Sequence, residues 1–139
     1  MRYGTRGLLE LALHHDQGPL SLAEIAEREN ISVKYLESLL GLLRSGGLVR
    51  SVRGAQGGYE LSRPPREITL REVFDVLEGS EPFVSCTDDH TACSRRPDCV
   101  TQQVWARMYV AAMQVLTDTT LADLANEAQE RHGIVMYDI

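Results

Sequence analysis

Three cysteines in the second half of the chain are its most reactive side chains. Cys86, Cys93 and Cys99 are separated by six and five residues. No pair has the Cys-x2-Cys spacing of structural zinc and no paired histidine motif follows, which gives a zinc-stabilised protein little support. Three nearby thiolates suit an iron–sulfur cluster or a thiol redox switch, because thiolate sulfur binds iron and is readily oxidised. Inert thiols remain the third interpretation.

A cluster usually has four protein ligands, so the three cysteines require one more. The candidates are His90 within the segment, an aspartate of the segment, Gln102 just beyond it, or a residue of a partner subunit. Arg95 and Arg96 lie between the second and third cysteines, where positive charge favours thiolate and offsets an anionic cluster.

Basic residues are concentrated in the first half of the chain. Residues 1–66 contain nine Lys and Arg against seven Asp and Glu, whereas residues 67–139 contain five against thirteen. Between Ser32 and Arg66 the basic residues are Lys34, Arg44, Arg50, Arg53, Arg63 and Arg66. This stretch could meet phosphates while the acidic half faces away; the alternative is a solvated surface of mixed charge.

The elements that would position these residues form a helix-turn-helix. Ser21 and Glu24 predict a capping box, and Ser32 is placed to cap the next helix. That helix has leucines at three- and four-residue steps and ends at Gly46-Gly47. Two helices joined by a turn of about three residues meet the requirement of the motif.

The flanking segments complete a winged helix. A helix around residues 8–13 precedes the pair, and residues 48–52 and 59–61 alternate around a glycine-rich turn, which predicts a hairpin. A second capping box at Thr69 opens a helix ending at Gly79. The predicted fold class is mainly α with a small two-stranded β-wing: a winged helix-turn-helix plus a long dimerisation helix.

The rest of the chain divides into a cysteine segment and two helices. Residues 101–118 predict a long amphipathic helix, and another starts at Thr120 and runs to His132-Gly133. The first is apolar enough to favour a dimer seam, with an internal helix of a monomer as the alternative. We expect one compact domain comprising a DNA-binding region (1–79), a cysteine loop (80–100) and a dimerisation and C-terminal region (101–139).

In a helix-turn-helix, the N-terminal residues of the second helix reach base edges in the major groove. Lys can donate to guanine and Glu can accept from cytosine, while an arginine beside glycine at the wing tip suits phosphate or a narrow minor groove. The alternatives are a Glu paired on the helix surface and a solvent-exposed turn arginine. The predicted DNA-binding residues are Ser32, Lys34, Tyr35, Glu37, Ser38, Arg53 and Gly54.

The sequence excludes several other classes. It contains no nucleophile elbow, phosphate-binding loop or HExxH motif, so we expect no enzyme. No apolar run approaches the roughly 20 residues of a membrane span, and the N-terminus lacks signal-peptide features. The odd cysteine count argues against a secreted disulfide scaffold, and the cytoplasm is the expected location.

Five stretches resemble one bacterial transcription-factor family: residues 21–28, 31–37, 47–59, 68–73 and 119–124. The family contains the iron–sulfur cluster assembly regulator, the nitric-oxide-sensitive repressor and the cysteine-metabolism repressor. The resemblance implies a homodimeric repressor, joined by the long helix, that binds palindromic promoter DNA. It places Ser32, Lys34, Glu37 and Arg53 on DNA, and Cys86, Cys93 and Cys99 at cluster-ligand positions. A [2Fe-2S] cluster is favoured over [4Fe-4S], with a cluster-free protein as the alternative.

The chain departs from its relatives at three places. Gln102 stands where the assembly regulator has a histidine ligand, and Arg2 stands where the nitric-oxide sensor has a ligand from its partner. The tail, residues 136–139, resembles that of the cysteine-metabolism repressor, which lacks the cysteine triad and acts with cysteine synthase. The alternative function is therefore a cysteine-metabolism regulator whose tail docks in that enzyme, with the thiols incidental.

Overall fold

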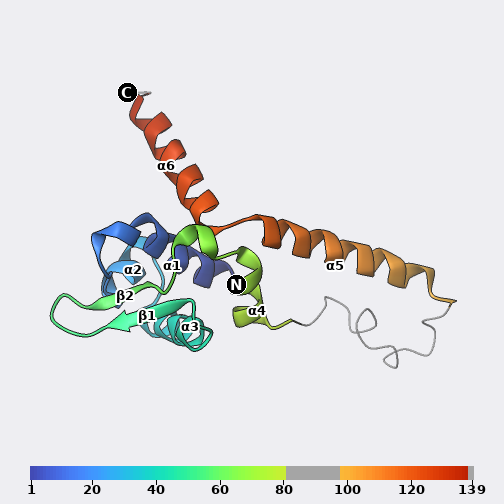
Figure 1. Cartoon of the computed structure of the whole chain (residues 1–139), viewed down its shortest axis with the longest axis horizontal. Helices are drawn as coiled ribbons and strands as arrows, with labels where there is room; N and C mark the ends of the chain where they lie inside the picture. The colour runs from blue at the N-terminus through green and yellow to red at the C-terminus, as the bar shows by residue number, and fades with distance from the viewer. Residues whose placement is uncertain (81–97, 138–139) are drawn as a thin grey trace.

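The computed structural model describes residues 1–80 and 98–137, with side chains to Gly133. Figure 1 shows a helical body with one small sheet, from which two further helices extend. The elements are α1 (Arg2–Leu13), η1 (His15–Gln17), α2 (Leu22–Glu29), α3 (Val33–Ser45), β1 (Val49–Val52), β2 (Gly58–Leu61), η2 (Pro65–Glu67), α4 (Leu70–Glu78), α5 (Val100–Asp118) and α6 (Leu121–Tyr137). The predicted winged-helix fold class is confirmed.

The helix pair α2–α3 forms as its local sequence predicts. The Ser21 hydroxyl accepts from the Glu24 amide at 3.2 Å, and the Glu24 carboxylate accepts from the Ser21 amide at 2.8 Å. Asn30 ends α2 with a left-handed φ of 51°, a conformation that asparagine tolerates better than most residues. The Ser32 hydroxyl then accepts from the Tyr35 amide at 3.2 Å, which caps α3 after a three-residue turn.

One hydrophobic core joins α1, the helix pair and the wing. Its fully buried side chains include Leu8, Ile25, Leu36, Leu40, Leu43, Leu48, Ile68, Val73 and Leu121. Burial of each contributes roughly 1.5–3 kcal/mol before the conformational entropy cost. Gly7 brings α1 close to the helix pair, because a Cβ there would lie 3.3 Å from Leu36 Cδ1.

The wing is anchored to the body by a strand pairing that the sequence did not predict. β1 and β2 are antiparallel, with Val49 opposite Leu61 and Val52 opposite Gly58. Leu20, just before α2, forms a bridge with Tyr59: Leu20 donates to the Tyr59 carbonyl at 3.0 Å, and Tyr59 donates back at 2.7 Å. The wing and the helix-turn-helix are thereby linked through backbone hydrogen bonds.

A second bridge returns the chain to the body before α6. Leu70 donates to the Thr119 carbonyl at 2.8 Å and Leu121 donates to the Ile68 carbonyl at 3.0 Å. α6 then packs against α1 and η2. The predicted end of this helix at His132-Gly133 was wrong, because α6 continues to Tyr137. A helical glycine costs about 1 kcal/mol relative to alanine, which by itself is too little to end a helix.

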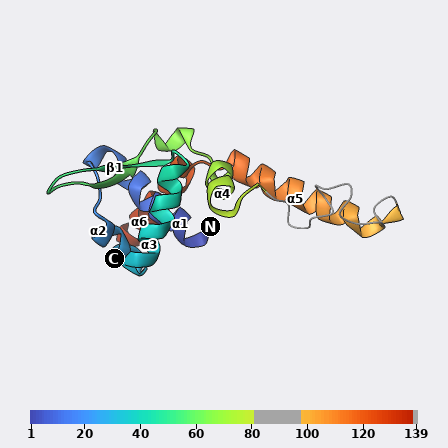
Figure 2. The ribbon, with the colours of Figure 1, turned by 90° about the horizontal axis from the view of Figure 1, so that it is seen from below.

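α5 extends away from the body in both ribbon views (Figure 1, Figure 2). It packs beside α4, and Met113 is its one buried residue. No helix in the described part of the chain combines the length and apolar character needed to cross a membrane.

Candidate functional site

The N-terminal half of α3 presents a polar face to solvent. Ser32, Lys34, Tyr35, Glu37 and Ser38 are all exposed, with Tyr35 at 48%. Leu36, Leu40 and Leu43 of the same helix point the other way, into the core, whereas Leu42 is exposed. The helical period thus places every predicted α3 residue on the outer face.

The two serines of this face retain complementary hydrogen-bonding capacity. Ser32 uses its hydroxyl oxygen as an acceptor for the cap of α3, so its proton stays available to donate. The Ser38 hydroxyl donates to the Tyr35 carbonyl at 2.7 Å, so its oxygen can still accept. A phosphate oxygen suits Ser32, whereas an exocyclic amino group of a base suits Ser38.

Glu37 makes no salt bridge with any residue that the structure describes. The alternative prediction of a paired surface glutamate is therefore unsupported within that part of the chain. An exposed carboxylate on this face can accept a hydrogen bond from the amino group of cytosine.

The wing presents Arg53 and Gly54 between its strands. Both are exposed, and Gly54 has a φ of +120° with open space around it. A side chain at Gly54 would strain the backbone, so glycine allows the tip to approach a ligand closely. Arg53 directly follows β1 and lies in the connection to β2, within the predicted hairpin turn.

Ion pairs neutralise half of the predicted basic surface. Arg50 pairs with Glu60 at 2.6 Å, Arg63 with Glu72 at 2.7 Å, and Arg66 lies 3.9 Å from Glu67. Lys34, Arg44 and Arg53 form no salt bridge to the described residues. The cations available for phosphate are thus fewer than the sequence indicated, because two of the neutralising glutamates come later in the chain.

The capping-box carboxylates of Glu24 and Glu72 have pKa values below the ordinary 4.5, so they stay ionised to lower pH than a free glutamate. The hydrogen bond from the Ser21 backbone lowers the pKa of Glu24. Partial burial, the largest single influence on Glu72, raises its pKa, but bonds from Arg63 and Thr69 together bring it below the ordinary 4.5. The negative charges at the N-termini of α2 and α4 also complement the helix dipoles.

Of the predicted metal ligands, the structure describes Cys99 and the candidate Gln102; Cys86, Cys93 and His90 lie outside the described residues. Cys99 is the N-cap of α5 and half-buried, with Sγ 3.2 Å from Thr101 Oγ1. Gln102 follows one turn later and is also half-buried. Within the described ranges, no three His, Cys, Asp or Glu side chains gather as a metal site.

The position of Cys99 suits an anionic ligand. The first turn of α5 contains no acidic residue, and the helix N-terminus carries partial positive charge that favours thiolate. Gln102 lies three residues after Cys99, in the first turn of α5. This geometry fits thiolate ligation by Cys99, while the neutral amide of Gln102 is a poor iron ligand.

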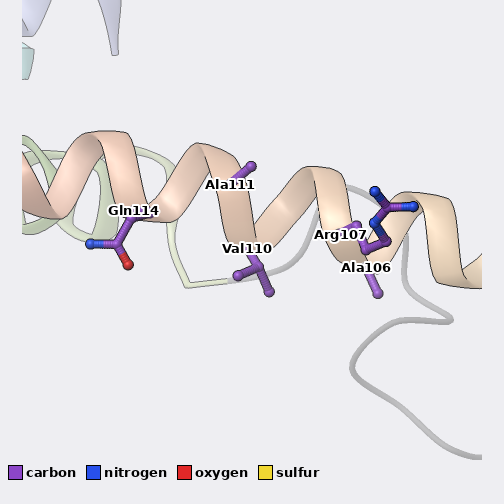
Figure 3. A pocket seen from close by; sticks show the side chains of 5 residues that line it. All are labelled: Ala106, Arg107, Val110, Ala111 and Gln114. Carbon is purple, nitrogen blue, oxygen red and sulfur yellow. The ribbon is translucent and has the colours of Figure 1, made fainter.

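α5 carries most of the exposed large hydrophobic side chains among the described residues. Its exposed large side chains are Val100, Val104, Trp105, Met108, Val110 and Val115. A shallow depression along the helix is lined by Ala106, Arg107, Val110, Ala111 and Gln114 (Figure 3). In the 19 residues of α5 the charged side chains are Arg107 and Asp118 alone.

The helix pair, its outward polar turn and the wing define a winged-helix DNA-binding transcriptional regulator. Residues 1–127 match the Rrf2 family, described as an iron-dependent transcriptional regulator, and the chain belongs to this family. The family resemblance drawn from the sequence is thus confirmed.

Two curated relatives are similar over most of their length. Protein rrf2 of Nitratidesulfovibrio vulgaris is 41% identical over 127 residues, covering 91% of this chain and 85% of the relative. The HTH-type transcriptional regulator CymR of Bacillus subtilis is 40% identical over 138 residues, covering 99% and 95%.

Two solved structures share the fold at comparable identity. T. potens IscR has a TM-score of 0.78 at 42% identity, covering 94% of this chain and 85% of that one. CymR, the global cysteine regulator of B. subtilis, has a TM-score of 0.78 at 40% identity, covering 91% and 92%.

Proposed function

We propose that the protein is a homodimeric repressor that reads palindromic promoter DNA with the N-terminal turn of α3 and the tip of the wing. The observation that carries this proposal is the set of exposed Lys34, Glu37 and Arg53, none of which is in a salt bridge with a described residue. Such a set combines phosphate attraction with a carboxylate that can discriminate bases. As a DNA-binding regulator, it would act in the cytoplasm.

The proposed dimer uses the exposed apolar strip of α5. Val100, Val104, Met108, Ala111 and Val115 follow one another at steps of four, four, three and four residues, so they share one side of the helix. The opposite side contains Met113, which is buried. A second copy of α5 covering the strip would remove this surface from water and set two reading heads about one DNA turn apart.

The proposed sensor is the cysteine triad. An iron–sulfur cluster held by Cys86, Cys93 and Cys99 would supply a group whose loss or oxidation reports redox state or iron supply. Cys99 caps the helix proposed to join the subunits, so a change in its ligation would bear directly on the start of α5. The angle between the two reading heads would then shift and alter DNA affinity. The family's description as iron-dependent supports this part.

The test is the iron and acid-labile sulfide content of protein purified without oxygen, followed by selection of binding sites from a randomised duplex library. We expect both iron and sulfide, a visible spectrum, and an enriched palindrome. Cys99→Ala should lose iron while remaining a folded dimer. The absence of iron and sulfide from the wild-type protein would overturn the proposed cluster. Failure to enrich any sequence would overturn the proposed sequence-specific DNA binding.

The similarity to CymR over 99% of the chain favours a second candidate, regulation by a cysteine-biosynthesis enzyme. In this version the tail, residues 136–139, docks in cysteine synthase and the thiols are incidental; residues 138–139 lie outside the described part. Co-purification of the enzyme with the full chain should be abolished by deletion of Ile139. Unchanged co-purification after the deletion would overturn tail docking.

A further inference from the structure

The first two turns of α1 touch the helix-turn-helix at the point where it would read DNA. Arg6 Nε lies 2.5 Å from Glu29 Oε2, and Arg6 Nη2 donates to the Glu29 carbonyl at 2.8 Å. Glu29 is the last residue of α2 and is followed directly by the left-handed Asn30. One guanidinium therefore binds both the side chain and an end carbonyl of α2, and holds the turn that leads into α3.

Tyr3 touches α3 itself. Its ring meets that of Tyr35 edge to face, with centroids 5.9 Å apart and planes at 81°. The Arg2 guanidinium lies 4.8 Å from the Tyr3 ring centre and also donates to its hydroxyl at 3.2 Å; that of Arg6 lies 5.8 Å from the ring centre. The Tyr3 ring thus lies near two cations and meets the Tyr35 ring at a nearly perpendicular angle.

These contacts order a region that the core does not reach. Tyr35 is 48% exposed on the polar face of α3, and the Arg6 side chain is 42% exposed. Beneath them, Gly7 lets α1 approach Leu36 and Ile25 closely, so the backbone that presents Tyr3 is itself fixed. Without Tyr3, the Tyr35 side chain would have to be ordered on DNA at an entropic cost to binding.

We propose that Tyr3 and Arg6 are positioning residues for DNA reading: Tyr3 sets the orientation of Tyr35, and Arg6 sets the turn that precedes α3. The inference rests on the proposed DNA-binding function. It extends the determinants of base preference to α1, which contributes none of the predicted DNA-binding residues.

The experiment compares Tyr3→Leu with Tyr3→Phe in the full-length protein, on the palindrome enriched by the wild type. Dissociation constants are measured for that site and for single-base variants opposite α3, together with Tm. Tyr3→Leu should weaken binding to the preferred site roughly 2- to 13-fold, the range expected for an edge-to-face pair, and flatten the base preference. Tyr3→Phe keeps the ring and should match the wild type.

A double-mutant cycle tests whether Tyr3 acts through Tyr35. Tyr3→Leu should have no further effect in a Tyr35→Leu background, because the partner ring is already gone. Additive losses would overturn the proposal, as would equal binding by the Phe and Leu variants. If the wild type itself shows no sequence preference, the proposed function fails first, which distinguishes the two failures.

Leu9→Ala is the matched control on α1. Leu9 lies beside Leu124 and Ala128 of α6, away from the reading face, so its truncation should lower Tm and leave base preference unchanged. A flattened preference in Leu9→Ala at a comparable loss of Tm would overturn the positioning role of Tyr3.

Arg6→Lys separates charge from geometry. Lysine keeps the positive charge but cannot reproduce the paired grip on Glu29. We expect a flattened base preference with an unchanged salt dependence of binding. Preference equal to the wild type would overturn the assignment of Arg6.

Discussion

At the level of single residues, Glu37 and Arg53 have different proposed roles in DNA recognition: Glu37 discriminates between bases, and Arg53 attracts phosphate. Glu37 is an unpaired carboxylate on the polar face of α3, within the described structure, and Arg53 is an exposed cation at the wing tip. A carboxylate near phosphates is repelled, so its contribution has to be to discrimination. A wing-tip arginine attracts any duplex.

We therefore expect opposite phenotypes from their removal. Arg53→Ala should weaken binding to all sequences and reduce the slope of log affinity against log salt by about one unit. Glu37→Ala should relax base preference by about 1–3 kcal/mol at one position with little general loss. Binding titrations at several salt concentrations, on matched and mismatched duplexes, check both. Unchanged base preference in Glu37→Ala would remove its role in readout.

Two glycines provide a test of the wing anchor. A Cβ at Gly58 would lie 2.1 Å from the Leu20 carbonyl oxygen, and its φ is +154°. Gly58→Ala should lower the free energy of unfolding by about 1–3 kcal/mol and weaken DNA binding. Gly41 on α3 has open space around it, so Gly41→Ala should raise stability by about 0.5–1 kcal/mol. Denaturant unfolding of both variants measures the difference.

The exposure of the polar residues of α3 was predictable because a helical period specifies which side chains point outward. Their electrostatic environment was not. Glu72 of α4 lies outside the basic stretch and neutralises Arg63 only once the chain is folded, whereas Glu67 is the sequence neighbour of Arg66. The contact of Tyr3 with Tyr35 was missed for the same reason, since it joins residues 32 positions apart with no shared pattern.

At the level of elements, capping boxes define where helices begin. The boxes at Ser21, Thr69 and Thr120 all form, and each combines a hydroxyl with a carboxylate three residues later. This chemistry is local, so sequence alone predicted the starts of α2, α4 and α6. The bridges made by Leu20 and by Thr69 each involve single residue pairs, which carry no periodic signal.

The capping carboxylate of α4 should make stability depend on acid. The pKa of Glu72 is below its ordinary 4.5, so its stabilising contribution is complete above that pH and is lost as pH falls through the folded-state pKa. Glu72→Gln should be less stable than the wild type at pH 7, by less than about 1 kcal/mol because the group is partly exposed. The difference should vanish in strong acid.

Unfolding curves for both proteins between pH 7 and pH 2 check this expectation. Glu27→Gln, at an exposed carboxylate of α2 that does not cap a helix, is the control and should show no such pH-dependent difference. A Glu72→Gln penalty that persists undiminished at pH 2 would show that the capping interaction does not depend on the charge.

At the level of the whole molecule, α5 is the element whose large apolar side chains are left exposed along most of its length. Its long exposed apolar strip was anticipated as a dimer seam, with a monomer core as the alternative. The structure leaves Met113 as the one buried residue of this helix, which favours the former. Cys99 is both a proposed cluster ligand and the N-cap of α5, the helix proposed to form the dimer.

Negative charge introduced into the apolar strip of α5 should dissociate the proposed dimer. Val104→Glu combined with Met108→Glu would bury unpaired carboxylates against the second copy, and should raise the dimer dissociation constant at least about 100-fold. Gln129→Glu, at an exposed position of α6, is the control and should leave the dimer intact. Sedimentation velocity gives the mass of each variant. An intact dimer in the double variant would assign the interface elsewhere.

The bridge between Thr69 and Thr120 has a consequence for how such a protein can diversify. α4 ends at Glu78, and α5 ends where Leu70, at the start of α4, donates to the Thr119 carbonyl, so both ends of the intervening stretch of sequence lie at α4. Recombination at these two boundaries would exchange the segment proposed to sense and to form the dimer, and would leave the proposed DNA-reading body intact. One body could in this way be coupled to different signals by replacement of a single contiguous stretch of sequence.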